Sequence, residues 1–273
     1  MDYELKLAPG SHSRNYWRDF LLSHELLYYL TWRDIVVRYK QTVVGILWAV
    51  LRPFLTMLVF TVVFSFLVRV PGPDGVPYSL LVLSGLTPWL FFATALSAIS
   101  VCLIANSAII TKIYFPRVII PLASLLANLV DFLVSLLLLL GLLLWYSYVP
   151  PWYIVALVPL TLLLMLFVFG LGTWFAALTV RYRDFTQLVP FFLLLGMYIS
   201  PVAYPIDLVP EKWMTLYSCN PMVGIIQGFR WAILGNIPFP ELPLEISGAA
   251  TVLILYIGLA YFRATEQTFA DSI

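Results

Sequence analysis

RDIVVRYKQTVVGILWAVLRPFLTMLVFTVVFSFLVR, residues 33–69, changes from charged to apolar within a few positions. Four charged residues fall within 33–40, and the run 43–68 that follows carries a single charge, Arg52, directly before Pro53. As a helix this run would be about 39 Å long, which exceeds the roughly 30 Å hydrocarbon core of a bilayer. Residues 43–51 are therefore predicted to lie near or within the membrane interface, with Pro53 permitting a bend and Arg52 at headgroup depth.

The composition of the 273 residues agrees with this pattern. Hydrophobic residues make up 62% of the chain, charged residues 11%, and the mean hydropathy is +0.95. A soluble domain carries roughly 25% charged residues, so this chain lacks the polar surface that water requires. We therefore predict an integral membrane protein. The 15 basic and 14 acidic residues nearly balance, which favours neither nucleic acid nor a strongly anionic partner.

Six apolar ranges are candidates for helices that cross the membrane, since each crossing takes about 20 apolar residues. The predicted spans are 53–69, 79–101, 119–144, 154–178, 187–203 and 246–262. The fifth is one of the shortest, and Pro190, Gly196 and Pro201 interrupt it. The predicted fold class is an all-α membrane protein with six transmembrane helices. Its predicted domains are a segment 1–52 with an interfacial helix over 16–30, a transmembrane domain 53–262 and a tail 263–273.

The distribution of basic residues predicts the orientation. Cytoplasmic loops of membrane proteins carry an excess of Lys and Arg. With the N-terminus inside, 12 of the basic residues fall on the cytoplasmic side, and only Arg69, Lys212 and Arg230 fall outside. Both termini are therefore predicted to be cytoplasmic, and the same skew supports six spans.

Two charges at membrane depth are candidates for function. Asp131 lies near the centre of the third predicted span, where an aspartate costs about 2.5–3.5 kcal/mol, so it should face protein or water. We favour a packing or channel-facing hydrogen-bond role for it over a proton site. Arg52 admits two interpretations. It snorkels to the headgroups, or it forms with Arg38 and Lys40 a cationic site for a lipid phosphate, whose oxygens match the arginine fork.

Two connecting regions have unusual compositions. Residues 106–121 place apolar and aromatic side chains beside Lys112 and Arg117 on a connection predicted to be cytoplasmic, which favours a docking surface for a soluble protein over a plain turn. Residues 200–245 are too rich in proline for a span and too hydrophobic for an exposed loop. Short re-entrant or surface helices at the outer face of the bundle are predicted there.

Several signatures of catalysis are absent from the sequence. It contains no G-x-x-x-x-G-K-[ST], no H-E-x-x-H and no G-x-S-x-G. His12 and His24 lack neighbouring residues of metal-ligand type, and Cys102 and Cys219 are far apart in the chain. We therefore predict no catalytic residue, no metal site and no nucleotide site in this chain. An unfamiliar membrane-bound enzyme that modifies glycans is kept as an alternative.

The sequence resembles the membrane subunits of ABC-2 type polysaccharide exporters, a family that includes O-antigen, capsular polysaccharide and teichoic acid exporters. The likeness starts in W-R-D-I-x-x-R-Y-K-Q-T-x-x-G-x-x-W-x-x-L-R-P at 32–53. It continues in family order through G-L-T-P-W (85–89), K-I-Y-F-P-R (112–117), R-Y-R-D (181–184), S-P-V-A-Y (200–204) and N-P-M (220–222), with a similar C-terminal F-R-x-x-E-x-x-F at 262–269. Several blocks in the same order identify a family more specifically than a single block does.

The resemblance implies a homodimeric channel in the bacterial cytoplasmic membrane, joined by two copies of a separate ATPase that binds the ATP and magnesium. It implies a substrate built on a lipid-linked glycan, with drugs or small lipids as the alternative cargo. The expected lipid diphosphate site is formed by Arg38, Lys40 and Arg52, and the expected channel aromatics are Trp48, Trp89 and Tyr204. Coupling to the ATPase is expected over 106–118, through Lys112, Ile113, Tyr114, Phe115, Pro116 and Arg117. An outer gate is expected in the region 204–245, and the expected gate residues are Pro201, Asn220 and Pro221.

Overall fold

The structure, a computed structural model, describes residues 16–40, 45, 47–70, 72, 75–113, 115–266 and 269. All regular elements in these residues are helical. In chain order they are α1 (Tyr16–Leu22), α2 (His24–Lys40), α3 (Leu47–Phe60), the π-helix η1 (Thr61–Leu67), α4 (Tyr78–Ala105), α5 (Ser107–Ile110), α6 (Ile119–Trp145), the short η2 (Trp152–Ala156), α7 (Leu157–Arg181), α8 (Phe185–Ile199), η3 (Ile206–Leu208), α9 (Glu211–Ser218), α10 (Pro221–Leu234) and α11 (Glu241–Thr265).

Five apolar helical segments are long enough to cross a bilayer. They are Leu47–Leu67, Tyr78–Ala105, Ile119–Trp145, Trp152–Arg181 and Glu241–Thr265. The fifth predicted span, 187–203, coincides with α8, which has 15 residues and therefore a length of about 22 Å. The all-helical membrane fold is thus confirmed, and the six-span arrangement stays a prediction.

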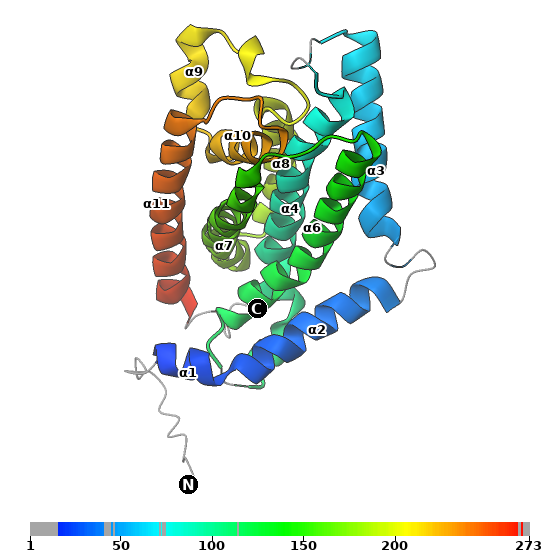
Figure 1. The fold of residues 1–273 in the computed structure, drawn as a ribbon. Helices are drawn as coiled ribbons and strands as arrows, with labels where there is room; N and C mark the ends of the chain where they lie inside the picture. The colour runs from blue at the N-terminus through cyan, green and yellow to red at the C-terminus, as the bar shows by residue number, and fades with distance from the viewer. Residues whose placement is uncertain are drawn as a thin grey trace.

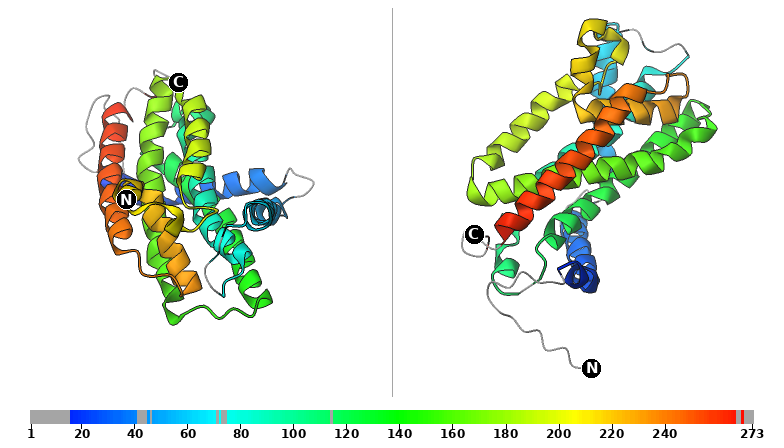
Figure 2. Two further views of the ribbon diagram at one scale, coloured as in Figure 1. Left: turned by 90° about the horizontal axis from the view of Figure 1, so that it is seen from above. Right: turned by 90° about the vertical axis from the view of Figure 1, so that its left-hand side faces the viewer.

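The long helices form a bundle around α4, which packs against α6, α7 and α10 (Figure 1). Its residues from Ser79 to Trp89 are all buried, so α4 forms the centre of the core. α1 and α2 cross one end of the bundle, while α9 and α10 lie toward the opposite end, as the side view at the right of Figure 2 also shows. We call these the α2 end and the α9 end.

The N-terminal helix differs from its predicted range. In place of one helix over 16–30, the chain forms α1 and α2 with a break at Ser23, whose hydroxyl donates to the carbonyl oxygen of Asp19 at 2.7 Å. The backbone N–H of Ser23 also donates to this oxygen, at 3.1 Å, so the break spans a single residue. α2 then continues to Lys40, so the whole cationic cluster of 33–40 lies on this helix.

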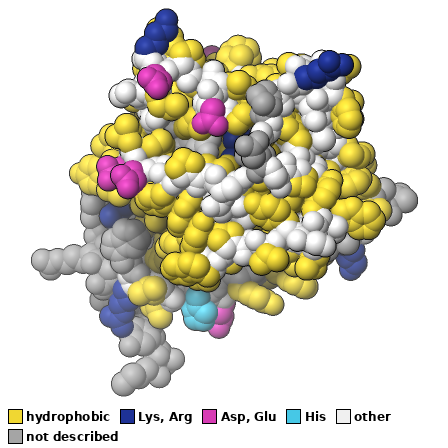
Figure 3. Space-filling model, turned by 45° about the horizontal axis from the view of Figure 1, so that its top comes forward, with side chains coloured by type: hydrophobic (Ala, Val, Ile, Leu, Met, Phe, Trp, Pro, Cys, Tyr) yellow, Lys and Arg dark blue, Asp and Glu magenta, His cyan; other side chains and the backbone are white. Residues whose placement is uncertain are grey.

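The predicted short helices within 200–245 are present, and they differ in exposure. α9 is largely exposed, whereas α10 is almost entirely buried against α4, α7 and α11. Apolar side chains cover much of the molecular surface, and charged side chains lie mainly toward the rim of the face shown in Figure 3. Large exposed apolar residues are frequent along α3, η1 and α8, which fits helices that face lipid or another chain.

Candidate functional site

A cavity of about 870 Å³ lies among α2, α3, α4 and α6, with one residue of α8 in its wall. Its polar residues come from four helices. They are Arg38 and Tyr39 from the last turn of α2, Arg52 from α3, Thr94 and Ser97 from α4, and Asn128, Asp131 and Ser135 from α6. Trp48, Leu90, Phe91 and Phe132 are among its apolar residues. The cavity therefore combines cationic and hydrophobic surface.

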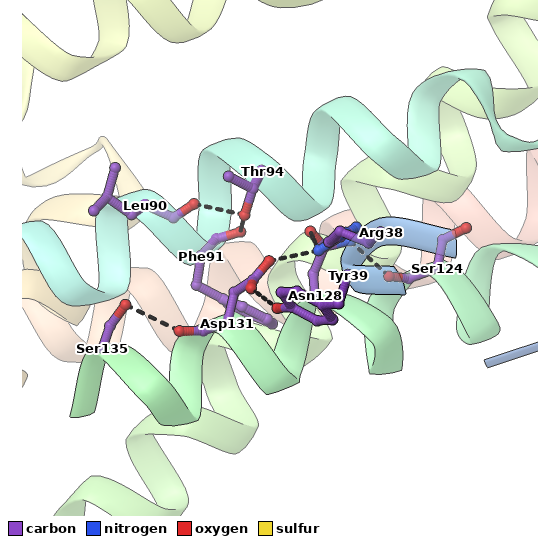
Figure 4. A network of polar contacts seen from close by, with 9 residues as sticks. All are labelled: Arg38, Tyr39, Leu90, Phe91, Thr94, Ser124, Asn128, Asp131 and Ser135. Carbon is purple, nitrogen blue, oxygen red and sulfur yellow. Dashed lines mark hydrogen bonds and ion pairs between the residues drawn. The ribbon is translucent and has the colours of Figure 1, made fainter. Parts of the chain in front are cut away.

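Arg38 is held in place by α6. Its Nη1 donates to Asp131 Oδ2 at 2.5 Å and to Asn128 Oδ1 at 3.1 Å (Figure 4). The hydroxyl of Tyr39 donates to the second oxygen of Asp131. Burial, together with this hydrogen bond, raises the pKa of Tyr39, so the hydroxyl remains a donor near neutral pH. These contacts fix the last turn of α2 on α6.

The ion pair changes the charge of the predicted phosphate site. Arg38 and Arg52 both line the cavity, but Asp131 offsets one of their two positive charges. The guanidinium of Arg52 is exposed and makes no ion pair with any residue that the structure describes. Lys40 is exposed at the end of α2 and lies outside the cavity wall. The structure thus brings Arg38 and Arg52 together, with Arg52 carrying the uncompensated charge.

The three predicted channel aromatics occupy different environments. Trp48 lines the cavity and is 51% exposed. Trp89 is buried between α4 and α8, where it contacts Phe92 at a ring-centroid distance of 5.3 Å and fills the space beside Gly196. Tyr204 lies at the α9 end, with its hydroxyl 2.8 Å from that of Tyr217. Of the three, Trp48 alone lines the cavity that contains Arg38 and Arg52.

The turn 200–204 is fastened from three sides. Asn220 caps α10, because its Oδ1 accepts the N–H of Met222 at 3.1 Å, and its Nδ2 donates to Ser200 Oγ at 2.9 Å. Pro221 occupies the first turn of the same helix, where proline is favoured, and Pro201 is buried. The Tyr78 hydroxyl donates to the carbonyl oxygen of Ala203 at 2.7 Å.

Arg230 supplies the third contact to this turn. It was counted among the basic residues on the predicted outer side, and it is 1% exposed within α10. Its two terminal nitrogens donate to the carbonyl oxygens of Val202 and Tyr204, each at 2.9 Å. Because the partners are backbone carbonyls, no sequence pattern could have revealed this role. Hydrogen bonds therefore join the segments that carry the predicted gate residues Pro201, Asn220 and Pro221.

The loop 106–118 has exposed and buried parts. Lys112 and Ile113 are exposed, Arg117 is half-buried, and Phe115 and Pro116 are buried; Tyr114 lies outside the described residues. At the start of the loop, Asn106 accepts a hydrogen bond at 2.7 Å from Arg33 Nη2 of α2. α2 is therefore attached both to this loop and to α6. Sequence reasoning placed Arg33 among the basic residues without a role.

Comparison with known families matches residues 25–234 to the ABC-2 type transporter family. The match covers well over half of the chain, so the chain belongs to this family. Members are membrane permeases, which confirms the predicted family, the transport function and the assignment as a non-enzymatic multi-pass subunit.

Individual relatives indicate which kinds of transporter within this family the chain is similar to. The O-antigen export system permease protein RfbA of Myxococcus xanthus is 30% identical over 251 residues, which are 91% of this chain and 95% of that protein. Its namesake from Klebsiella pneumoniae is 29% identical over 248 residues, 90% and 94% of the two chains. The polysialic acid transport protein KpsM of Escherichia coli is 24% identical over 245 residues, 88% and 93%.

Proposed function

We propose that two copies of this chain form the channel of an ATP-driven exporter that carries lipid-linked polysaccharide across the bacterial cytoplasmic membrane. Relatives that align over about nine-tenths of the chain are named for O-antigen export and polysialic acid transport. Both names refer to glycans, which favours a polysaccharide cargo over drugs or small lipids. The chain itself contains no phosphate-binding loop motif, so ATP and magnesium would be bound by a partner ATPase.

The proposed topology has six spans with both termini and the α2 end in the cytoplasm. The skew of 12 basic residues against 3 supports it. α8 is short for a crossing, but Arg181 and Arg183 precede it and the buried turn 200–204 follows it. Basic residues at one end and protein-buried backbone at the other suit a short helix that completes its crossing inside the bundle.

The cavity beside Arg52 is the observation that carries the substrate class. Its volume of about 870 Å³ lies at the upper end of the usual range for ligand pockets. An uncompensated arginine can bind phosphate oxygens through its fork of donors, while Trp48, Leu90 and Phe91 supply surface for a lipid chain or a sugar ring. An anionic head group on a hydrophobic carrier matches both parts. We propose that this cavity receives the lipid diphosphate.

The exposed tip of the loop 106–118 is the proposed contact for the ATPase. Lys112 and Ile113 are exposed there, and Ile113 retains 58% of its accessible surface. An exposed isoleucine beside a lysine suits a mixed apolar and charged docking surface. Closure of an ATPase dimer would press on this tip, and α2 and α6 would receive the displacement through Asn106 and Arg33.

Arg52→Ala is expected to lower export about tenfold or more, because a hydrogen-bonded charge contributes about 1.5–3 kcal/mol. Arg52→Lys should be milder if charge alone matters. Co-purification of the ATPase should not change, since the cavity that Arg52 lines includes no residue of the loop 106–118. Arg69→Ala is the matched control, because Arg69 is also exposed and flanks the opposite end of the same membrane segment. Normal export by Arg52→Ala would remove the phosphate site from the proposal.

Inactivation of the gene tests the function itself. Polysaccharide should still be synthesised and should accumulate inside the cell, with surface polysaccharide reduced at least tenfold by fractionation and glycan staining. Restoring the gene should restore the surface material. Loss of synthesis without internal accumulation would count against export and in favour of a membrane-bound glycan-modifying enzyme. Co-purification with an ATPase encoded nearby is the supporting biochemical result.

A further inference from the structure

The C-terminal motif F-R-x-x-E-x-x-F at 262–269 has a structural role that the transport function does not account for. Phe262 and Phe269 are both buried, and their rings meet edge to face at a centroid distance of 5.3 Å. The guanidinium of Arg117 lies 6.0 Å from the centroid of the Phe269 ring. The motif therefore adjoins the end of the loop 106–118, although about 150 positions separate the two in sequence.

Glu266 makes the most specific of these contacts. Its Oε1 accepts the backbone N–H of Arg117 at 2.8 Å and lies 3.4 Å from the hydroxyl of Tyr16 in α1. In return, the Arg117 side chain donates to the backbone carbonyl oxygen of Glu266. Arg263 lies over the Tyr16 ring, 4.7 Å from its centroid. Three segments, α1, the loop and the end of α11, thus meet at one carboxylate.

Burial supports a structural role for this carboxylate. Burial raises the pKa of Glu266, and the hydrogen bonds from Arg117 and Tyr16 act against that rise. A carboxylate withdrawn from water is costly unless donors surround it. A backbone N–H is a donor that cannot move unless the chain moves with it, so this hydrogen bond fixes the position of Arg117 itself.

The loop 106–118 is consequently held at both ends. At its start, Asn106 accepts from Arg33 at 2.7 Å and donates to the carbonyl oxygen of Cys102 at 2.8 Å. At its end, Phe115 and Pro116 are buried and Arg117 is bound to Glu266. Lys112 and Ile113 lie exposed between these anchors. A tip that is fixed on both sides passes a displacement to the helices, whereas a loose tip absorbs it.

We propose that Glu266 is the positioning residue of the loop 106–118: it anchors the loop's end so that force applied at the exposed tip reaches α6, which begins two residues after Arg117. This inference rests on the proposed function in one respect, namely that a partner ATPase presses on the tip. The anchoring itself does not depend on that function. The two parts can therefore be tested separately.

Trypsin cleavage after Arg117, which is half-buried and bound to Glu266, measures the anchoring in membranes that contain the full chain. Glu266→Ala removes the acceptor and should raise the cleavage rate about tenfold, because cleavage follows the population of the opened loop and loss of a charged hydrogen bond favours opening. Glu266→Gln keeps an acceptor oxygen of the same shape and should restore most of the protection. Glu245→Ala is the control, since Glu245 is exposed on the same helix. An unchanged cleavage rate in Glu266→Ala would overturn the proposal.

The assembled complex with the ATPase measures the consequence. In Glu266→Ala, the ATPase should still co-purify and hydrolyse ATP, because Lys112 and Ile113 are unaltered. Export per ATP hydrolysed should fall about tenfold, and Glu266→Gln should recover it. Faster cleavage with normal coupling would also overturn the positioning role. If the wild-type complex exports no polysaccharide, the proposed function fails, and the trypsin result still decides whether Glu266 anchors the loop.

Discussion

Asp131→Ala is expected to lower export about thirtyfold, because removing this counter-ion costs about 2 kcal/mol of the free energy that holds α2 on α6. Asp131 accepts from Arg38 at 2.5 Å and from the hydroxyl of Tyr39. The alanine variant leaves both donors without their carboxylate. It also weakens the attachment of α2 to α6, and α2 carries the Arg33 contact to Asn106.

The magnitude follows from the exposure of the pair. The side chains of Arg38 and Asp131 retain 34% and 27% of their accessible surface. Exposed ion pairs contribute about 0–1 kcal/mol, and breaking a buried pair costs about 3–5 kcal/mol. This pair is intermediate, so about 2 kcal/mol is the expected value. Asp131→Asn keeps an oxygen for Tyr39 and should have a smaller effect.

A double-mutant cycle separates two roles of Arg38. If Arg38 acts through Asp131, then Arg38→Ala, Asp131→Ala and the double variant should reduce export to similar extents. If Arg38 mainly binds phosphate, Asp131→Ala would free its charge and strengthen binding of an anionic lipid. Leu137→Ala is the control, because Leu137 is exposed on the same helix and lies outside the cavity wall. Additive effects of the two single variants would contradict the coupling.

The positions of the long helices were predictable because the bilayer imposes them. Each crossing needs a run of about 20 apolar residues, and such runs are visible in the sequence. The end of the fifth run was harder to place, since Pro201 lies after the helix, in the turn 200–204. The break at Ser23 was also missed. The apolar pattern continues across the break, and the Ser23 backbone N–H still donates to the carbonyl oxygen of Asp19 at 3.1 Å, so no sequence signal marks the interruption.

The candidate site was predictable in its residues and less so in their partners. Of the predicted group, Arg38 and Arg52 line one cavity and Lys40 lies outside its wall, and their role in phosphate binding stays a prediction. The pair formed by Arg38 and Asp131 was missed, since 93 positions separate them. The sequence did contain a signal for this pair, because a carboxylate at membrane depth, such as that of Asp131, requires a hydrogen-bond donor. Choosing that donor needed the packing of α2 on α6, which no local pattern encodes.

Gly258→Ala is expected to destabilise the membrane domain by about 1–3 kcal/mol, because α7 and α11 touch backbone to backbone at this position. A methyl group on Gly258 would overlap the carbonyl oxygen of Gly170 on the facing helix. On the other side, a methyl group on Gly170 would lie 2.6 Å from the Cα of Leu255. Glycines at such crossings let membrane helices approach closely and gain van der Waals contact.

A backbone obstacle cannot be relieved by rotating a side chain, so the two helices must separate along their contact. Thermal unfolding of the purified chain in detergent should show a midpoint lowered by about 5 °C for Gly258→Ala. Gly248→Ala on the same helix is the matched control, because a methyl group there meets no atom within 4 Å among the described residues. Its midpoint should stay within about 1 °C of wild type. Equal midpoints for both variants would mean that α7 and α11 lie further apart than in this structure. The packing of α7 on α11 would then not fix α11, nor the position of Glu266 at its end.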